Sequence, residues 1–340
     1  MRDIHESHEL RHALLSAVFA TAGIAFLVLF LWFAWKLLFL LFAGLLLALV
    51  LRSWADLVRY ATGLSPTRSY VVTVLIVILM TALAAWFLVP RVIDQAGQLA
   101  VVIPRSLAQI RTSLSHSDWG QHIVHFVGNS VGRSAGSGVA TTIAAKLADT
   151  IAAAFVVLVV GLYGGLNPGL YLNGLLRLFP VAKRERARHV GSEVLYVLRW
   201  WLLGQLVPMT VLGLACMIGL RLLHVPLAFI LGLFTGLMIF VPYVGALLSE
   251  IPAVLVAFER GPETVLYVLI LYLGTHVLEA YILTPFVQKR AVRLPPILTI
   301  VSQFLLWTLT GILGVAIATP LAAVALVLVR MLYLHEEIEH

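Results

Sequence analysis

The sequence predicts an all-α integral membrane protein, a polytopic helical bundle of about eight spans, two of them Gly/Pro-broken helical hairpins. Three observations lead to this fold class. Of the 340 residues, 61% are apolar and only 11% are charged, whereas a soluble domain carries about 25% charged residues. Apolar runs recur at the length, roughly 20 residues, that a helix needs to cross a bilayer. Two further apolar stretches are interrupted by Gly and Pro.

Six apolar runs are candidate spans, and they cover residues 13–34, 36–52, 69–90, 148–172, 200–222 and 263–284. We expect Lys36 to separate the first two runs, which then form a hairpin with a short connection. The N-terminus mixes acids and histidines and lacks the basic start of a secretory signal. We therefore expect the first run to stay in the membrane, within a three-helix region formed by residues 1–90.

Residues 91–147 form the one large piece between spans, and we expect it to be extracytoplasmic. Apolar residues recur there at helical spacing, which predicts an amphipathic helix that Pro104 interrupts. The Gly- and Ser-rich residues 128–139 indicate a flexible joint. The segment either lies on the membrane or on another subunit, or is a solvated linker.

Residues 148–340 form the predicted core transport region, and it contains both broken stretches. The first, residues 226–258, contains Phe240-Val241-Pro242-Tyr243-Val244-Gly245 and Ile251-Pro252. The second, residues 297–329, contains Gly311-Ile312-Leu313-Gly314 and Thr319-Pro320. An unpaired backbone group in hydrocarbon costs several kcal/mol, so a broken helix survives only inside protein or beside a watery cavity. Two such stretches in one chain point to a transporter's substrate site.

Lys and Arg in the short loops predict the orientation. They dominate residues 52–68, 173–199 and 285–295, which places these three loops on the cytoplasmic side. The candidate spans agree with this assignment if both termini are cytoplasmic and each broken stretch either crosses twice or folds back.

Polar residues within apolar segments are candidates for the transport site. Glu279 is the strongest, because an acid at bilayer depth costs roughly 2.5–3.5 kcal/mol on insertion scales and usually faces the bundle interior. His276 lies three residues earlier on the same helical face, so the pair could relay a proton or hold a cation. Alternatively, Glu279 joins two helices or lies in water. Glu250 is a second candidate for ion coupling, unless it lies in water at a hairpin tip.

The further candidates are amides, a hydroxyl and the residues of the breaks themselves. Each polar one could bind a solute or hydrogen-bond a neighbouring helix. They are Gln205, Pro242, Tyr243, Gly245, Gln303, Thr310, Gly311, Gly314 and Pro320. Two pairs of small residues four apart, Gly232 with Gly236 and Gly161 with Gly165, are interpreted as helix-packing contacts.

Several function classes are disfavoured. There is no Walker loop, no nucleophile elbow and no paired metal-ligand histidines, so we expect neither an enzyme nor a cofactor or metal site. The single Cys216 excludes an internal disulfide. The net charge of +7 is spread over short loops, which argues against nucleic-acid binding.

An ordered series of short blocks resembles a known family. The blocks are Arg177-Leu178-Phe179-Pro180, Gly204-Gln205, His224-Val225-Pro226-Leu227-Ala228, Phe240 to Gly245, Ile251-Pro252-Ala253, Leu278-Glu279, Leu283-Thr284-Pro285, Leu294-Pro295-Pro296, Gly311 to Gly314, and Ala318-Thr319-Pro320-Leu321-Ala322. On these the chain resembles the autoinducer-2 exporter family of bacterial inner-membrane transporters. The resemblance implies export of autoinducer-2, or for some members sodium(lithium)/proton antiport. The resemblance implies that the acidic residue in a late helix of the family corresponds to Glu279. Ala280 stands where relatives usually have asparagine.

Three functional hypotheses follow. The leading one is gradient-driven or facilitated export of a small polar solute. The second is a cation/proton antiporter in which Glu279 exchanges ions. The third is a membrane scaffold or assembly protein that uses residues 91–147 to bind partners. We expect a homo-oligomer, because an amphipathic helix outside the bundle needs an apolar surface to cover.

Overall fold

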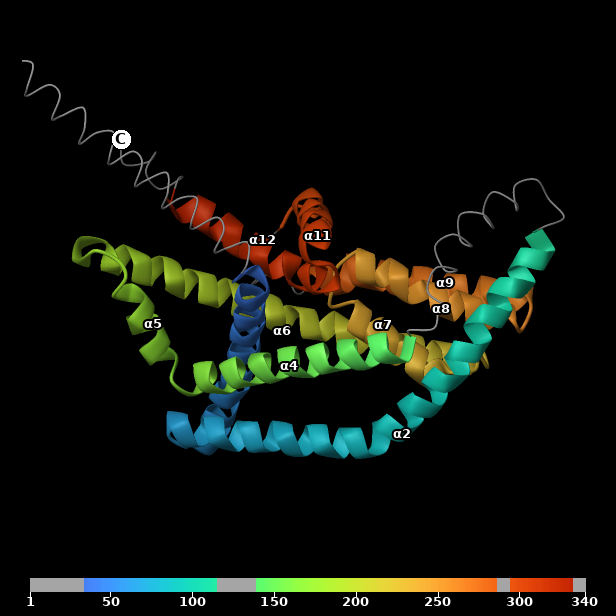
Figure 1. Ribbon diagram of the computed structural model, residues 1–340, viewed down its shortest axis with the longest axis horizontal. Coiled ribbons are helices and arrows are strands. Elements are labelled where there is room, and N and C mark those ends of the chain that lie inside the picture. The colour runs from blue at the N-terminus through green and yellow to red at the C-terminus, as the bar shows by residue number, and fades with distance from the viewer. Residues whose placement is uncertain (1–33, 115–138, 286–293, 333–340) are drawn as a thin grey trace, which may run out of the picture.

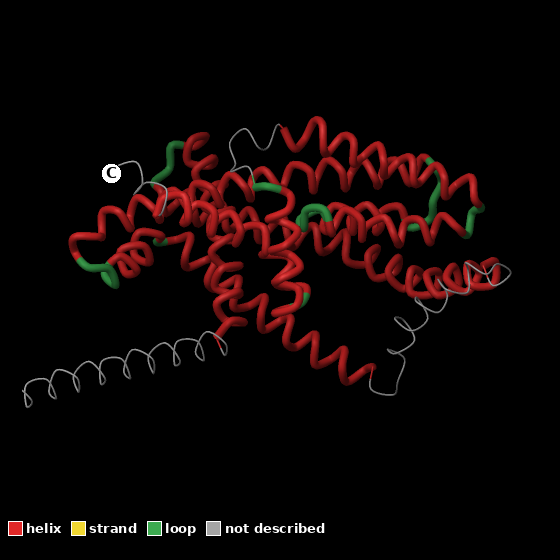
Figure 2. The backbone as a smooth tube through the Cα atoms, turned by 90° about the horizontal axis from the view of Figure 1, so that it is seen from above, coloured by secondary structure: helices red, strands yellow, loops and turns green. Residues whose placement is uncertain are grey.

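A computed structural model describes residues 34–114, 139–285 and 294–332. These residues are helical apart from short links, and no strand occurs among them (Figure 2). Five helices are long and apolar enough to cross a membrane, or six if one bent pair counts as a single span, and three shorter apolar helices accompany them. The predicted all-helical membrane fold is therefore confirmed.

The first described helix, Ala34–Thr62, continues through Lys36. Lys36 thus lies near the start of this helix, and the predicted hairpin with the preceding run stays a prediction. Most of the predicted first run lies outside the described residues. The helix also runs through Arg52 and Arg59. The connection to the next helix therefore consists only of residues 63–65, which is shorter than the predicted basic loop 52–68. Asp56 stabilises this extension, since it lies 3.8 Å from Arg52 and 3.0 Å from Arg199.

Helix α2 (Pro66–Leu114) joins the predicted span 69–90 and the predicted amphipathic helix into one element. Pro90 and Pro104 both lie inside it. The predicted interruption at Pro104 is therefore wrong, because the helix continues past this residue. Proline removes one backbone hydrogen bond and bends a helix without necessarily ending it, and α2 bends visibly along its length (Figure 1). Its later part packs on α7 and α8. The predicted joint, up to residue 138, lies outside the described residues.

Helices α4 (Val139–Leu166) and α5 (Pro168–Leu176) replace the predicted straight span 148–172. The two are bent by 90° at Asn167. The residue before a proline disfavours helical φ and ψ, and Asn167 is at φ −131° and ψ 65°. A short 3-10 turn, η2 (Val181–Lys183), leads into α6 (Arg184–Leu222). Most of the predicted loop 173–199 is thus helical.

The first broken stretch forms a hairpin of α7 (Ala228–Met238) and α8 (Val244–Phe258), joined by residues 239–243. At 1.5 Å per residue these helices are about 17 and 22 Å long, shorter than the roughly 30 Å hydrocarbon core. The lengths fit a hairpin that folds back and not a double crossing. Pro252 lies inside α8, so the expected second interruption is absent there.

Helix α9 (Pro262–Leu278) continues into a π-helical turn, η3 (Glu279–Leu283). The second broken stretch then follows as α11 (Pro296–Thr310) and α12 (Ile312–Leu332), which pack on each other. This stretch breaks only at Gly311, because α12 runs through Gly314 and Pro320. Most of the predicted basic loop 285–295 lies outside the described residues.

Helices α6 and α7 pack closely on each other. A Cβ on Gly232 would lie 2.5 Å from the Met217 Cβ, and one on Gly236 would lie 2.8 Å from the Met209 carbonyl oxygen. The packing interpretation of this glycine pair is confirmed. Gly161 likewise packs against Leu47 of the first described helix. The largest buried cluster continues from this contact into α8 and α9, with Cys216 and Tyr272 at its centre.

Candidate functional site

A cavity of about 510 Å³ lies where both broken stretches meet α6 and α9. Its wall comes from α6, the link between α7 and α8, the start of α8, the end of α9 with η3, and the two helices of the second stretch. The lining residues are Trp201, Gln205, Pro208, Pro242, Tyr243, Ala246, Leu247, His276, Glu279, Ala280, Leu283, Thr284, Leu294, Thr299 and Thr319. Five of the predicted site residues therefore lie around one space.

The link between α7 and α8 closes one side of the cavity with an unusual turn. Tyr243 is at φ 65° and ψ −65°, and the Val244 amide donates to the Pro242 carbonyl at 2.8 Å. This is a three-residue γ-turn with positive φ, which is rare and strained for a residue with a side chain. Gly245 follows it so closely that a Cβ would overlap the carbonyl of Met238. Gly245 is therefore required for backbone approach and does not line the cavity.

Two side-chain amides hold this link in place. The Gln205 amide on α6 donates to the Ile239 carbonyl at 2.5 Å, and the Gln303 amide on α11 donates to the Pro242 carbonyl at 2.9 Å. Gln303 also approaches the Thr319 hydroxyl at 3.4 Å. Its side-chain oxygen is buried without a hydrogen-bond partner. The second broken stretch thus fixes the turn in the first.

His276 and Glu279 line the cavity, and with Glu250, which is not among the lining residues, they form a trio centred on His276. Its Nε2 hydrogen-bonds the Glu250 carboxylate, and its Nδ1 lies 3.9 Å from a carboxylate oxygen of Glu279. All three side chains are partly buried, with exposed fractions of 21–33%. Glu250 lies within α8 and not in the link at the tip of the hairpin. An imidazole between two carboxylates can hold or pass a proton, and its charge depends on its protonation state.

Glu279 also begins the π-helical turn η3. A π-helical turn widens the helix by one residue and occurs frequently at functional sites. It brings Glu279, Ala280 and Leu283 to the cavity wall. No sequence signal pointed to this turn, which depends on the packing of α9 against its neighbours.

The remaining predicted residues of the second stretch do not line the cavity. Gly311 is at φ 69° and ψ −144°, a conformation that only glycine adopts readily, and this explains the break. Gly314 and Pro320 are buried inside α12. Thr310 ends α11, and its side chain lies outside the described part of the structure.

Much of the cavity wall has no distinctive signal in the sequence. Trp201 and Pro208 on α6 read as ordinary apolar residues, and Thr299 as a helix-interior hydroxyl. Thr319 was visible only as part of the Thr319-Pro320 motif. Within the described residues, no group of His, Cys, Asp and Glu is arranged to hold a metal ion.

The chain is similar to known proteins. Residues 22–333 match a family model described as "AI-2E family transporter". The chain is similar to two proteins of Bacillus subtilis (strain 168), each named a "putative transport protein". It is 29% identical to YueF over 44% of this chain and 40% of the relative, and 30% identical to YrrI over 43% and 42%. The chain thus spans about two fifths of the length of the curated relatives it matches.

Proposed function

The chain belongs to the AI-2E family of transporters, and we propose that it exports a small polar solute, such as autoinducer-2, through the cavity between its two broken stretches. Export is driven by a gradient or is facilitated, and the protein works in the bacterial cytoplasmic membrane with both termini in the cytoplasm. One observation carries the proposal: both broken stretches meet at a cavity lined by Glu279 and His276.

The cavity combines apolar walls with a few fixed polar groups, as solute sites generally do. α8 begins at the cavity, where Ala246 and Leu247 of its first turn form part of the wall. A helix N-terminus carries a partial positive charge that can stabilise a polar or anionic group of a solute. The Thr299 and Thr319 hydroxyls, on the opposite helices, can both donate and accept hydrogen bonds.

Coupling is assigned to the trio of Glu250, His276 and Glu279. In this role Glu279 takes up a proton or cation while the solute occupies the cavity, and His276 transmits the change to Glu250 through their hydrogen bond. Because the three groups share one network, a change of charge on one alters the preferred charge of the others.

Solute flux in proteoliposomes tests the proposal. Glu279→Gln keeps the shape of the side chain and removes its charge, and we expect at least a tenfold loss of flux. Glu263→Gln is the matched control, since Glu263 lies in the first turn of the same helix and outside the cavity wall. Flux that survives Glu279→Gln at every pH would remove Glu279 from the mechanism. A folded protein that moves nothing but retains a defined partner would favour the scaffold hypothesis.

The trio also favours a second candidate, the sodium(lithium)/proton antiporter. Two carboxylates beside one imidazole provide the exchangeable charge that such a transporter needs. Sodium-dependent dequenching of a pH-sensitive dye in vesicles, lost in Glu279→Gln, supports the antiporter. Solute flux that is unaffected by sodium and lithium supports the exporter.

A further inference from the structure

The connection between α4 and α6 is a compact basic and apolar surface that the proposed transport function does not use. We call residues 167–189 the elbow. It contains the bend at Asn167, the short helix α5, the turn η2 and the start of α6. Figure 1 shows α5 linking the ends of α4 and α6 at one end of the molecule.

Within the elbow, α5 lies perpendicular to α4, the helix that precedes it. α4 meets α5 at 90°, and α4 is an apolar helix of 28 residues. If α4 runs along the membrane normal, then α5 lies in the plane of the bilayer surface. An apolar helix in that position buries side chains at the boundary between headgroups and acyl chains.

The side chains of the elbow match this location. Large apolar residues are exposed, with Leu170 at 68%, Leu178 at 79% and Val181 at 77% exposed. Five cations accompany a single carboxylate, Glu185, and the cations are Arg177, Lys183, Arg184, Arg186 and Arg188. Apolar groups that insert and cations that stay in the headgroup layer are the two components of an anionic membrane surface site.

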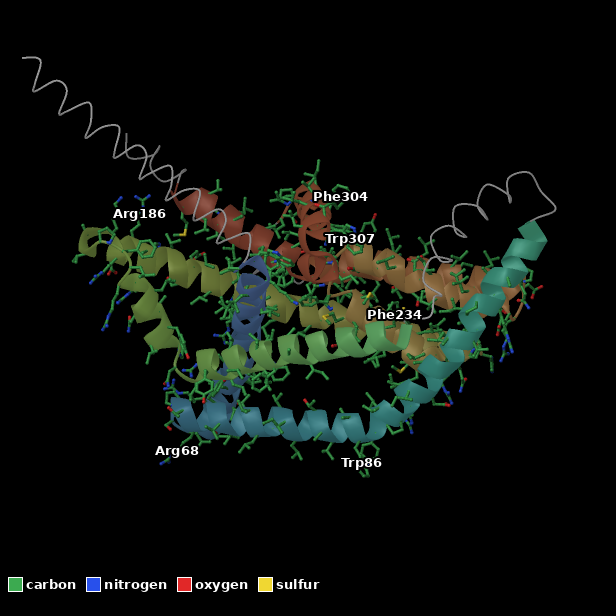
Figure 3. The ribbon with its side chains drawn as sticks, in the orientation of Figure 1. Arg68, Trp86, Arg186, Phe234, Phe304 and Trp307 are labelled. Atoms are coloured by element: carbon green, nitrogen blue, oxygen red, sulfur yellow. The ribbon has the colours of Figure 1, made fainter. Side chains whose placement is uncertain are left out.

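Two of the cations form hydrogen bonds to backbone carbonyl groups. Arg184 donates to the Phe179 carbonyl at 3.1 Å, and Arg186 approaches the Met331 carbonyl of α12 at 3.4 Å. Arg177, Lys183 and Arg188 are exposed, and among the described residues none of the three pairs with a carboxylate. Figure 3 shows Arg186 on the same side of the view as Arg68, which lies in the first turn of α2.

From this geometry we propose that the elbow binds the headgroups of anionic phospholipids in the cytoplasmic leaflet. Arg177, Lys183 and Arg188 contact the phosphates, while Leu170, Leu178 and Val181 insert between the acyl chains. The elbow therefore recognises a negatively charged lipid surface and links α4 and α6 to the lipid composition of the membrane.

The test compares two charge-matched triple variants of the full chain. Arg177→Gln with Lys183→Gln and Arg188→Gln removes the elbow charges. Arg105→Gln with Arg221→Gln and Arg260→Gln removes three exposed arginines from α2, the end of α6 and the link before α9. The thermal unfolding midpoint of each purified protein is titrated with dioleoylphosphatidylglycerol, with dioleoylphosphatidylcholine and with inorganic phosphate.

We expect phosphatidylglycerol to raise the midpoint of the wild type more than phosphatidylcholine does, because a ligand that binds the folded state stabilises it. One Lys or Arg at an anionic surface accounts for about a fivefold change in binding, so three account for roughly a hundredfold. The elbow variant should lose this stabilisation, whereas the arginine control should keep it. High salt should also abolish it in the wild type.

Four results would overturn the proposal. They are no preference of the wild type for phosphatidylglycerol, a wild-type response in the elbow variant, an equal loss in the control variant, and the same stabilisation by inorganic phosphate alone. If the elbow variant unfolds in detergent, immobilisation of spin-labelled phosphatidylglycerol by the wild type in mixed phosphatidylcholine and phosphatidylglycerol vesicles decides the matter. Immobilisation that does not weaken with salt would then refute a role for the charges.

Discussion

Gln303 is the residue that joins the two broken stretches. Its amide nitrogen donates to Pro242 and approaches Thr319, while its side-chain oxygen is buried without a partner. A net hydrogen bond contributes about 1 kcal/mol to stability, whereas a buried unpaired polar atom costs about 1–3 kcal/mol. The hydrogen bonds of Gln303 therefore add little net stability to the protein. We infer that its role is to fix the position of the γ-turn at Tyr243.

Replacing Gln303 with methionine should affect transport more than stability. Gln303→Met keeps the length of the side chain, so we expect the free energy of unfolding to fall by only about 1 kcal/mol, since the lost hydrogen bonds are partly offset by removal of the unpaired oxygen. Solute flux should fall at least fivefold because the turn loses its support. Denaturant titration and proteoliposome flux measure the two effects. Ser302→Ala is the control, because its hydroxyl bonds only within α11. A loss of stability without a loss of flux would show that the link needs no support from α11.

The breaks in the two stretches depend on glycine for two different physical reasons. Gly245 is needed because the start of α8 touches the end of α7, and Gly311 is needed because its φ is positive. The prolines have less effect, since Pro252 and Pro320 remain inside helices whose neighbours cover them. Close approach and backbone conformation, and not proline content, therefore decide where these stretches break.

Alanine at two glycines should shift stability in opposite directions. Gly245→Ala forces a Cβ onto the Met238 carbonyl, and we expect the free energy of unfolding to fall by about 3 kcal/mol. Gly274→Ala in α9 meets open space and should raise it by up to about 1 kcal/mol, because alanine favours helix more than glycine does. Thermal unfolding of the two purified variants measures both changes. Equal stability would mean that the α7–α8 contact relaxes to admit a methyl group.

At the scale of the whole molecule, much of the apolar surface faces outward. The candidate span in α2 has only 6% of its most apolar window buried. Such a surface must meet lipid or a second copy of the chain, and the expected homo-oligomer remains a prediction. The elbow is strongly basic, since it carries five cations and one carboxylate.

Cysteine labelling tests the orientation of the whole molecule. Cys216 is the only cysteine in the sequence and is fully buried, so a Cys216→Ala background permits single-cysteine variants. Arg260→Cys, between α8 and α9, should react with a membrane-impermeant maleimide in intact cells. Glu185→Cys, at an exposed position in the elbow, should react only after permeabilisation. Reaction of both residues from the same side would contradict a single crossing by α6 followed by a folded-back hairpin.

Features that depend on local chemistry are predictable from the amino-acid sequence. Its apolar runs required helices in a membrane, Pro242 and Gly311 marked the actual breaks, and His276 and Glu279 shared a face because they lie three residues apart. The predicted interruptions at Pro104 and Pro320 are wrong, because one proline does not outweigh the packing of a long helix.

Which distant residues meet depends on how the helices pack. Glu250 reaches His276 across 26 positions, and Gln303 reaches Pro242 across 61. Neither pairing has a sequence signal, because each depends on how α8 packs on α9 and how α11 lies against the link after α7. Residue identity fixes the local backbone, whereas the cavity exists only where four packed elements leave a space. The physical reason is that backbone preference acts over a few residues, and side-chain packing acts over the whole fold.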